Sequence, residues 1–167
     1  MQILASYNIK GGVGKTSTSV NLAFHSAHEG ARTLIWDLDP QGAATFYFRV
    51  RPKIKGGSRA LLKGRQDLAD LIKATDYENL DLLPSDFSYR TMDLLLDDTK
   101  KPNERLKILL SPLTGEYDYV FLDCPPGLTL LSESIFEAAN VLVVPVIPTS
   151  LSLRTLKQLV EFRRKKQ

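Results

Sequence analysis

The glycine-rich segment from Lys10 to Thr16, Lys-Gly-Gly-Val-Gly-Lys-Thr, constrains this chain more than any other stretch. It follows an apolar run, Gln2–Tyr7, that is typical of a short strand, and it leads into a helical pattern over Lys15–Gly30. Glycines let backbone N–H groups curl around an anion, and the N-terminus of the following helix adds its positive end. The order of strand, glycine loop and helix therefore predicts a phosphate-binding βα unit.

The lysine and threonine side chains at the end of this loop are expected to have different roles. Lys15 is expected to bridge β- and γ-phosphates, and the Thr16 hydroxyl is expected to ligate Mg²⁺. The common phosphate-loop template requires glycine at the position of Ile9, so only its second half is matched. A tight glycine turn without a ligand is the alternative, but a lysine inside such a turn has little use in packing. The residues expected to bind nucleotide are Lys10, Gly11, Gly12, Val13, Gly14, Lys15, Thr16 and Ser17.

Strand and helix patterns alternate along the rest of the chain. The expected strands are Gln2–Tyr7, Arg32–Asp37, Asn79–Pro84, Tyr117–Leu122 and Val141–Ile147, and the expected helices are Lys15–Gly30, Gln66–Thr75, Phe87–Leu96, Asn103–Leu110, Leu130–Ala139 and Ser150–Arg164. Pro40–Gly64 is expected to be irregular because prolines and glycines interrupt it. This alternation favours an α/β fold with a mostly parallel sheet flanked by helices. Ligands bind at the carboxyl ends of such strands, which directs attention to the loops after Tyr7, Asp37 and Leu122.

Two of these loops carry carboxylates. Asp37 and Asp39 stand at i and i+2, so their side chains point to the same side of a strand end, toward whatever the glycine loop binds. One can serve the water shell of a metal while the other orients an attacking water; two solvated turn acids before Pro40 are the alternative. Asp123 ends the apolar run Tyr119–Leu122, where a carboxylate holds Mg²⁺ through water. The expected metal residues are Thr16, Asp123 and one carboxylate of the pair Asp37 and Asp39.

Composition narrows the class of protein. With 167 residues, 43% of them hydrophobic and 25% charged, the chain fits one soluble globular domain. Its single cysteine, Cys124, excludes an internal disulfide and a multi-cysteine metal site, and we interpret this thiol as a bystander. The N-terminus lacks a signal-peptide pattern, and the longest apolar run, Val141–Ile147, is too short to cross a bilayer. These features predict a cytoplasmic protein without membrane insertion.

The net charge of +3 is distributed unevenly. One acid-free run carries seven basic residues: Arg49, Arg51, Lys53, Lys55, Arg59, Lys63 and Arg65. A second run, Arg154–Lys166, contains six basic residues and the single acid Glu161. Either run could contact phosphates, and either could equally be a solvated surface.

The paired lysines of the glycine loop resemble a known family. Lys-Gly-Gly-x-Gly-Lys-Thr, with Lys10 as its first lysine and Lys15 as its second, looks like the deviant Walker A motif of the ParA/MinD family of ATPases, which are P-loop NTPases. The resemblance implies that Lys10 reaches across a dimer interface to the partner's nucleotide.

The loop after the second strand looks like the family's switch I, in which Asp39 positions water and Asp37 lies near Mg²⁺. Asp123 and the following Pro-Pro-Gly resemble its Walker B and switch II. The implied catalytic residues are Lys10, Lys15 and Asp39.

The segment Asp-Pro-Gln-Gly after the second strand is similar to the partition branch of this family. That similarity implies ATP and Mg²⁺ as cofactors, an ATP-dependent homodimer, a ParB-type partner, sequence-independent DNA binding and association with the nucleoid. Two alternatives stay open: a MinD-like ATPase on a membrane surface, held by the amphipathic last helix, and a P-loop metabolic enzyme. Family members usually continue with further strands and helices, so residues 1–167 are expected to form a single deviant Walker A domain without the family's C-terminal part.

Overall fold

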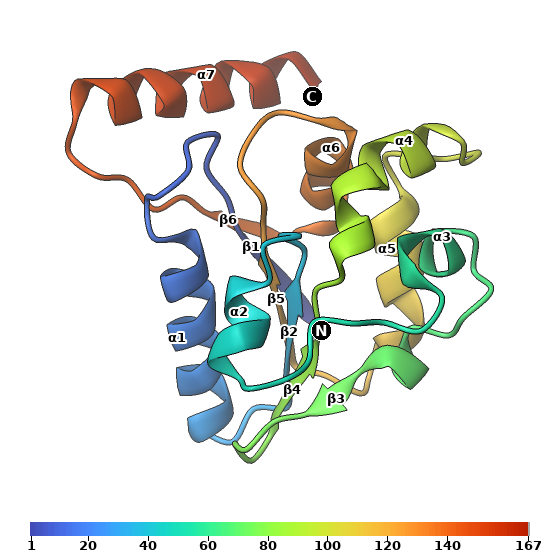
Figure 1. Ribbon diagram of the computed structural model, residues 1–167. Helices are drawn as coiled ribbons and strands as arrows, with labels where there is room; N and C mark the ends of the chain where they lie inside the picture. Colours follow the sequence, from blue (N-terminus) through green and yellow to red (C-terminus); the bar gives the residue numbers. More distant parts are fainter. Residues whose placement is uncertain (167) are drawn as a thin grey trace.

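The computed structural model describes residues 1–166, with side chains described through Arg164. The last residue, Gln167, and the side chains of Lys165 and Lys166 in the second basic run therefore lie outside the described part. Within it, one six-stranded sheet has the order β3-β4-β2-β5-β1-β6 (Figure 1). All neighbouring strands are parallel except β3, which runs antiparallel to β4. The expected α/β class with a mostly parallel sheet is confirmed.

Most helices and strands lie where the sequence pattern predicts them. The strands are β1 (Gln2–Ser6), β2 (Thr33–Asp37), β3 (Lys73–Ala74), β4 (Leu80–Leu83), β5 (Tyr119–Asp123) and β6 (Val141–Val143). The α-helices are α1 (Lys15–His28), α2 (Ala43–Tyr47), α3 (Gly57–Leu62), α4 (Met92–Asp97), α5 (Arg105–Leu110), α6 (Leu130–Ala138) and α7 (Ser150–Lys166). Three 3₁₀ turns are η1 (Ala69–Leu71), η2 (Phe87–Thr91) and η3 (Ser111–Leu113).

Helices cover both faces of the sheet, so its central strands are buried on both sides. Figure 1 shows α1 and α2 on one face and α3, α4, α5 and α6 on the other. Every residue of β2 is buried; Ile35 packs toward α1, whereas Leu34 and Trp36 belong to the larger core on the opposite face. Burying a side chain of this size stabilises the fold by roughly 1.5–3 kcal/mol. The indole N–H of Trp36 is satisfied by the Tyr89 hydroxyl at 3.3 Å.

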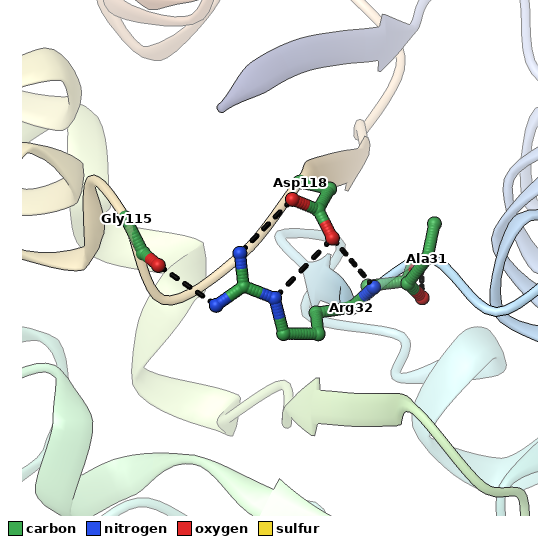
Figure 2. A network of polar contacts seen from close by, with 5 residues as sticks. Ala31, Arg32, Gly115 and Asp118 are labelled. Carbon is green, nitrogen blue, oxygen red and sulfur yellow. Dashed lines mark hydrogen bonds and ion pairs between the residues drawn. The ribbon is translucent and has the colours of Figure 1, made fainter.

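The amino ends of β2 and β5 are held together by one arginine (Figure 2). Arg32 donates to Asp118 from its backbone N–H at 3.0 Å, from Nε at 3.3 Å and from Nη2 at 3.0 Å, while Nη1 donates to the carbonyl of Gly115 at 2.8 Å. These hydrogen bonds hold the pKa of Asp118 below its usual value. The network aligns two central strands at the end of the sheet opposite the glycine loop.

Three sequence-based assignments of secondary structure are wrong. The expected helix over Gln66–Thr75 is instead η1 followed by the edge strand β3, because pairing of β3 with β4 replaces local helical hydrogen bonds. The segment Pro40–Gly64, expected to be irregular, contains α2 and α3. The expected strand Val141–Ile147 ends at Val143, two residues before a proline that cannot donate a ladder hydrogen bond.

Candidate functional site

The glycine loop lies between the carboxyl end of β1 and the first turn of α1. Gly12 and Gly14 have φ of 71° and 93°, in the left-handed region where a side chain would be strained. A cavity of about 390 Å³ opens over the loop, and residues from three segments line it: Gly11, Gly12, Gly14, Lys15, Thr16, Ser17, Asp39 and Pro126. Of the predicted loop residues, Val13 is buried and Lys10 is half-buried, and neither lines the cavity. The fold thus brings six of the eight predicted loop residues to one cavity.

Lys15 lies at the base of this cavity with only 7% of its surface exposed. Its Nζ donates to the Lys10 carbonyl at 3.2 Å, which places the ammonium across the loop rather than in solvent. Burial lowers the pKa of Lys15, and the nearby charges of Asp123 and Asp39 partly oppose that shift. A desolvated cation beside an open backbone loop is suited to bind a polyphosphate.

Asp37 is fully buried, and both of its carboxylate oxygens accept hydrogen bonds from the chain. Oδ2 accepts from the backbone N–H of Thr45 at 2.8 Å and from its hydroxyl at 2.7 Å, and Oδ1 accepts from the Asp39 N–H at 3.2 Å. Burial raises the pKa of Asp37 to about 6, although these hydrogen bonds oppose the shift. Asp37 therefore fixes the end of β2 to the first turn of α2 through Thr45.

Asp39 lines the cavity, and Ser85 holds its backbone. The Ser85 hydroxyl donates to the Asp39 carbonyl at 2.5 Å, and the Ser85 N–H donates to the Thr45 hydroxyl at 2.8 Å. Together with Asp37, these residues close a buried ring of hydrogen bonds behind Asp39. Sequence reasoning missed Thr45 and Ser85. Ser85 follows β4, so the rule that ligands lie at strand carboxyl ends could have indicated it.

Asp123 stands in register with Ser6 of β1 and Asp37 of β2, at the centre of the sheet. Its Oδ1 accepts from Ser19 at 3.4 Å, whereas Oδ2 is buried and has no hydrogen-bond partner within residues 1–166. Burial raises the pKa of Asp123 to about 7, and the nearby hydroxyl groups of Thr16 and Ser19 oppose the shift. A buried oxygen without a partner is costly unless a cation or its water shell satisfies it. The arrangement of Thr16 and Asp123 fits Mg²⁺.

The described residues contain no cluster of three or more His, Cys, Asp or Glu side chains that could hold a metal alone. Mg²⁺ usually takes one or two protein carboxylates together with substrate phosphates. Cys124, next to Asp123, is fully buried, and burial raises the pKa of its thiol well above the usual value. Its geometry agrees with the interpretation of a bystander.

Comparison with known proteins identifies the family. An AAA domain model matches residues 1–167, the whole chain. Sporulation initiation inhibitor protein Soj of Bacillus subtilis is 39% identical over 160 residues, which cover 95% of this chain and 63% of Soj. The chain belongs to the ParA/MinD family of ATPases.

Two further relatives extend the comparison. Chromosome partitioning protein ParA of Myxococcus xanthus is 35% identical to this ParA/MinD family chain over 161 residues, covering 95% of the chain and 56% of that ParA. A structure of cobyrinic acid a,c-diamide synthase from Mycobacterium smegmatis, with bound ATP analogue and magnesium, superposes with a TM-score of 0.89 at 32% identity. That likeness covers 96% of this chain and 66% of the synthase. The chain thus spans less than two thirds of the length of the curated relatives Soj and ParA.

Two residues to which the sequence analysis gave no role, Tyr7 and Asn8, tether the glycine loop. The Tyr7 hydroxyl donates to the carbonyl of Gly127, and the Gly127 N–H donates to the Ile9 carbonyl at 3.1 Å. Asn8 accepts from the Lys10 N–H at 2.9 Å and donates to the Pro145 carbonyl at 2.8 Å. The loop is therefore bonded directly to the Pro-Pro-Gly segment after β5 and to the chain leaving β6.

The buried Asp123 is expected to make the stability of the ligand-free protein depend on pH. Between the usual pKa of 3.8 and the raised value of about 7, the unfolded chain ionises this carboxyl while the folded chain keeps its proton. The stability of the ligand-free fold is therefore expected to decrease as pH rises through this window, with Asp37 contributing to the same trend. Asp123→Asn should remove part of the decrease. Thermal unfolding without nucleotide, from pH 5 to pH 8, measures it.

The matched control for this experiment is Asp97→Asn, because Asp97 is an exposed carboxyl on α4. That variant should follow the wild-type dependence on pH. If Asp123→Asn shows the same pH dependence as the wild-type chain, Asp123 is ionised in the ligand-free fold and the interpretation of its raised pKa is wrong.

Proposed function

We propose that this chain binds ATP with Mg²⁺, hydrolyses it, and acts as a ParA-like partition switch in the cytoplasm. The observation that carries the proposal is the unpartnered Oδ2 of Asp123, which is buried beside Thr16 and close to the glycine-loop cavity. Around one cavity thus lie a carboxylate oxygen without a hydrogen-bond partner, a buried lysine and the backbone N–H groups of the glycine loop. These groups match the charges of a metal-bound triphosphate.

Each residue near the cavity takes a distinct role in this proposal. Lys15 and the N-terminus of α1 hold the β- and γ-phosphates, and Thr16 and Asp123 hold the metal. Bound there, Mg²⁺ would neutralise charge that develops on the phosphate oxygens. Both oxygens of Asp37 already accept hydrogen bonds from Thr45 and Asp39, so we place Asp37 behind the metal as the residue that fixes the loop.

Asp39 is the residue that we assign to the attacking water. Its carboxylate borders the cavity, and its Oδ1 accepts only the local N–H of Gln41 at 2.9 Å among the described hydrogen bonds. The other oxygen is free to accept from a water held near the γ-phosphate. Orienting such a water, or removing its proton, contributes roughly 10²–10⁴-fold to a rate.

Lys10 supports the proposal of an ATP-dependent dimer. Lys10 is half-buried and does not line the cavity of its own chain, and no carboxylate within the described residues forms an ion pair with its side chain. A cation in that position can neutralise phosphate charge bound to a second copy of the chain. A ParB-type partner and sequence-independent DNA binding belong to the same proposal, as the role in partition of the relative ParA suggests.

Lys10→Ala tests the dimer. The variant is expected to bind ATP with Mg²⁺ nearly as well as the wild-type chain but to stay monomeric, because the phosphate charge of the partner is no longer neutralised across the interface. Light scattering coupled to size exclusion, with and without a non-hydrolysable ATP analogue, measures the mass. Lys100→Ala removes an exposed lysine elsewhere and should dimerise normally. A Lys10→Ala chain that doubles its mass with the analogue would exclude the proposed role.

A second candidate, a P-loop metabolic enzyme, rests on the likeness to cobyrinic acid a,c-diamide synthase. ATP consumption that required a small organic acid, and that was unaffected by DNA or by a ParB-type protein, would favour this candidate over partition.

For the membrane alternative, the described helices include none with the length and apolar character needed to cross a bilayer. On α7, Leu159 packs into the core while Leu153 stays exposed, so only part of its apolar stripe is available to another surface.

A further inference from the structure

The end of α2 presents two aromatic rings and two arginines on the surface. Phe46 is 79% exposed and Tyr47 is 58% exposed, although large aromatic side chains are usually buried. A shallow cavity of about 520 Å³ is lined by Phe46, Tyr47, Arg49, Val50 and Arg51. We call these five residues the α2 patch. It lies outside the nucleotide site described above.

Arg49 occupies a backbone position where glycine is usually found. The Arg49 N–H donates to the Phe46 carbonyl at 3.0 Å, and the Val50 N–H donates to the Thr45 carbonyl at 3.2 Å, which together form a Schellman ending of α2. The residue after the cap of such an ending is usually glycine because its φ is positive, and Arg49 has a φ of 57°. An arginine there strains the backbone, and glycine would relieve that strain.

The charge of the patch is not neutralised. No acid occurs between Pro40 and Gln66, and none of the ion pairs among the described residues involves Arg49 or Arg51. Two unpaired guanidinium groups beside exposed rings favour an anionic ligand that also has flat apolar surfaces. The side chains of the patch thus match phosphates joined to aromatic bases.

A second cavity of about 300 Å³ adjoins the patch through Tyr47. It is lined by Val20, Asn21, Phe24, Tyr47, Phe48 and Tyr77, and so continues the aromatic surface toward α1. In the sequence Asp76 and Glu78 flank Tyr77, which makes that far end unfavourable for phosphates. An anionic strand would therefore be held at the arginine end and would extend its bases toward the rings.

We propose that the α2 patch binds single-stranded nucleic acid, with Arg49 and Arg51 contacting phosphates and Phe46 and Tyr47 stacking on bases. Bases in a duplex are paired and stacked on one another, so exposed rings gain little from intact double-stranded DNA. The two ring centroids lie 6.4 Å apart with an interplanar angle of 63°, so the rings present different faces and cannot stack on one base together. This binding goes beyond the proposed ATPase switch and does not require nucleotide.

Fluorescence anisotropy of the whole chain with a labelled 15-nucleotide oligo-dT, without ATP, tests the proposal. We expect binding that weakens as salt rises and that exceeds binding to a 15-base-pair duplex by about fivefold or more. Phe46→Ala should weaken binding to oligo-dT by about 5- to 100-fold, since it removes one stacking surface. Leu94→Ala, which truncates a 73% exposed apolar side chain on α4, is the matched control and should not change it.

Arg49→Gly separates binding from folding. This variant should melt at the same or a higher temperature than the wild-type chain, because glycine accepts the positive φ, yet it should bind oligo-dT more weakly. The slope of log affinity against log salt should fall by roughly 0.7, as expected for one lost phosphate contact. Lys100→Ala, an exposed cation elsewhere, should leave affinity and slope unchanged.

Three outcomes would overturn the proposal. Equal affinity for duplex and oligo-dT, with no effect of Phe46→Ala, would mean that charge alone acts and that the rings do not stack. Binding to phosphatidylglycerol vesicles but not to oligo-dT would assign the patch to a membrane surface. Absence of oligo-dT binding at low salt would show that the patch has no nucleic-acid function. None of these outcomes bears on ATP binding or on the ATP-dependent dimer, which the Lys15 and Lys10 variants test separately.

Discussion

Replacing Lys15 by alanine is expected to lower the affinity for ATP with Mg²⁺ by about 100-fold or more. The Lys15 ammonium is the one cation that the described part of the chain places at the base of the glycine-loop cavity, where burial keeps water away from it. Charge-assisted hydrogen bonds to phosphate are strong, and a loss of about 2.7 kcal/mol corresponds to a factor of about 100. Isothermal titration with ATP and Mg²⁺ gives the affinity directly.

Lys15 is 7% exposed, so its truncation to alanine could also disturb packing. Lys15→Gln keeps most of the side chain and removes the charge, and it should lose nearly as much affinity as the alanine variant. Lys100→Ala controls for the removal of one surface charge. If either Lys15 variant binds ATP as tightly as the wild-type chain while its melting temperature is unchanged, the assignment of the glycine loop to phosphate is wrong.

The sequence predicted the sheet better than its periphery. The strands that became β1, β2 and β5 were recognisable because each is a short apolar run, and buried parallel strands need apolar side chains on both faces. The assignment over Gln66–Thr75 failed because Leu68 and Leu71 are spaced like a helix, whereas β3 is specified by its pairing with β4. Local periodicity contains no information about such pairing.

The candidate site was predictable where chemistry is local in sequence. The glycine loop, Asp39 and Asp123 were found because each lies at the end of an apolar strand, and the fold brings those ends together. The ring through Thr45 and Ser85 was not predicted, since these two residues are 40 positions apart and meet only after β4 pairs with β2. Hydroxyl groups are too common in loops for position alone to indicate such a role.

Asp39→Ala is expected to retain binding of ATP while slowing hydrolysis by about 100-fold or more, the range typical of a lost general base or water-orienting group. Asp39 reaches the cavity from the loop after β2, a different segment from the glycine loop, so its removal should leave the phosphate contacts of Lys15 and Thr16 in place. Titration of ATP together with a phosphate-release assay separates the two effects. Full hydrolysis by this variant would move the role to another group, and Asp37 is the carboxylate nearest along the chain.

Ser85→Ala provides the companion measurement, because it leaves the Asp39 carboxylate present but removes the hydroxyl that holds the Asp39 carbonyl at 2.5 Å. A residue that only positions Asp39 should lower kcat by roughly tenfold with little change in ATP affinity, and Ser85→Thr should restore part of the rate. Ser134→Ala is the control, since that buried serine accepts the Leu106 N–H on the α5–α6 side of the sheet. Equal losses in the Ser85 and Ser134 variants would indicate general destabilisation and would leave Asp39 without the proposed support.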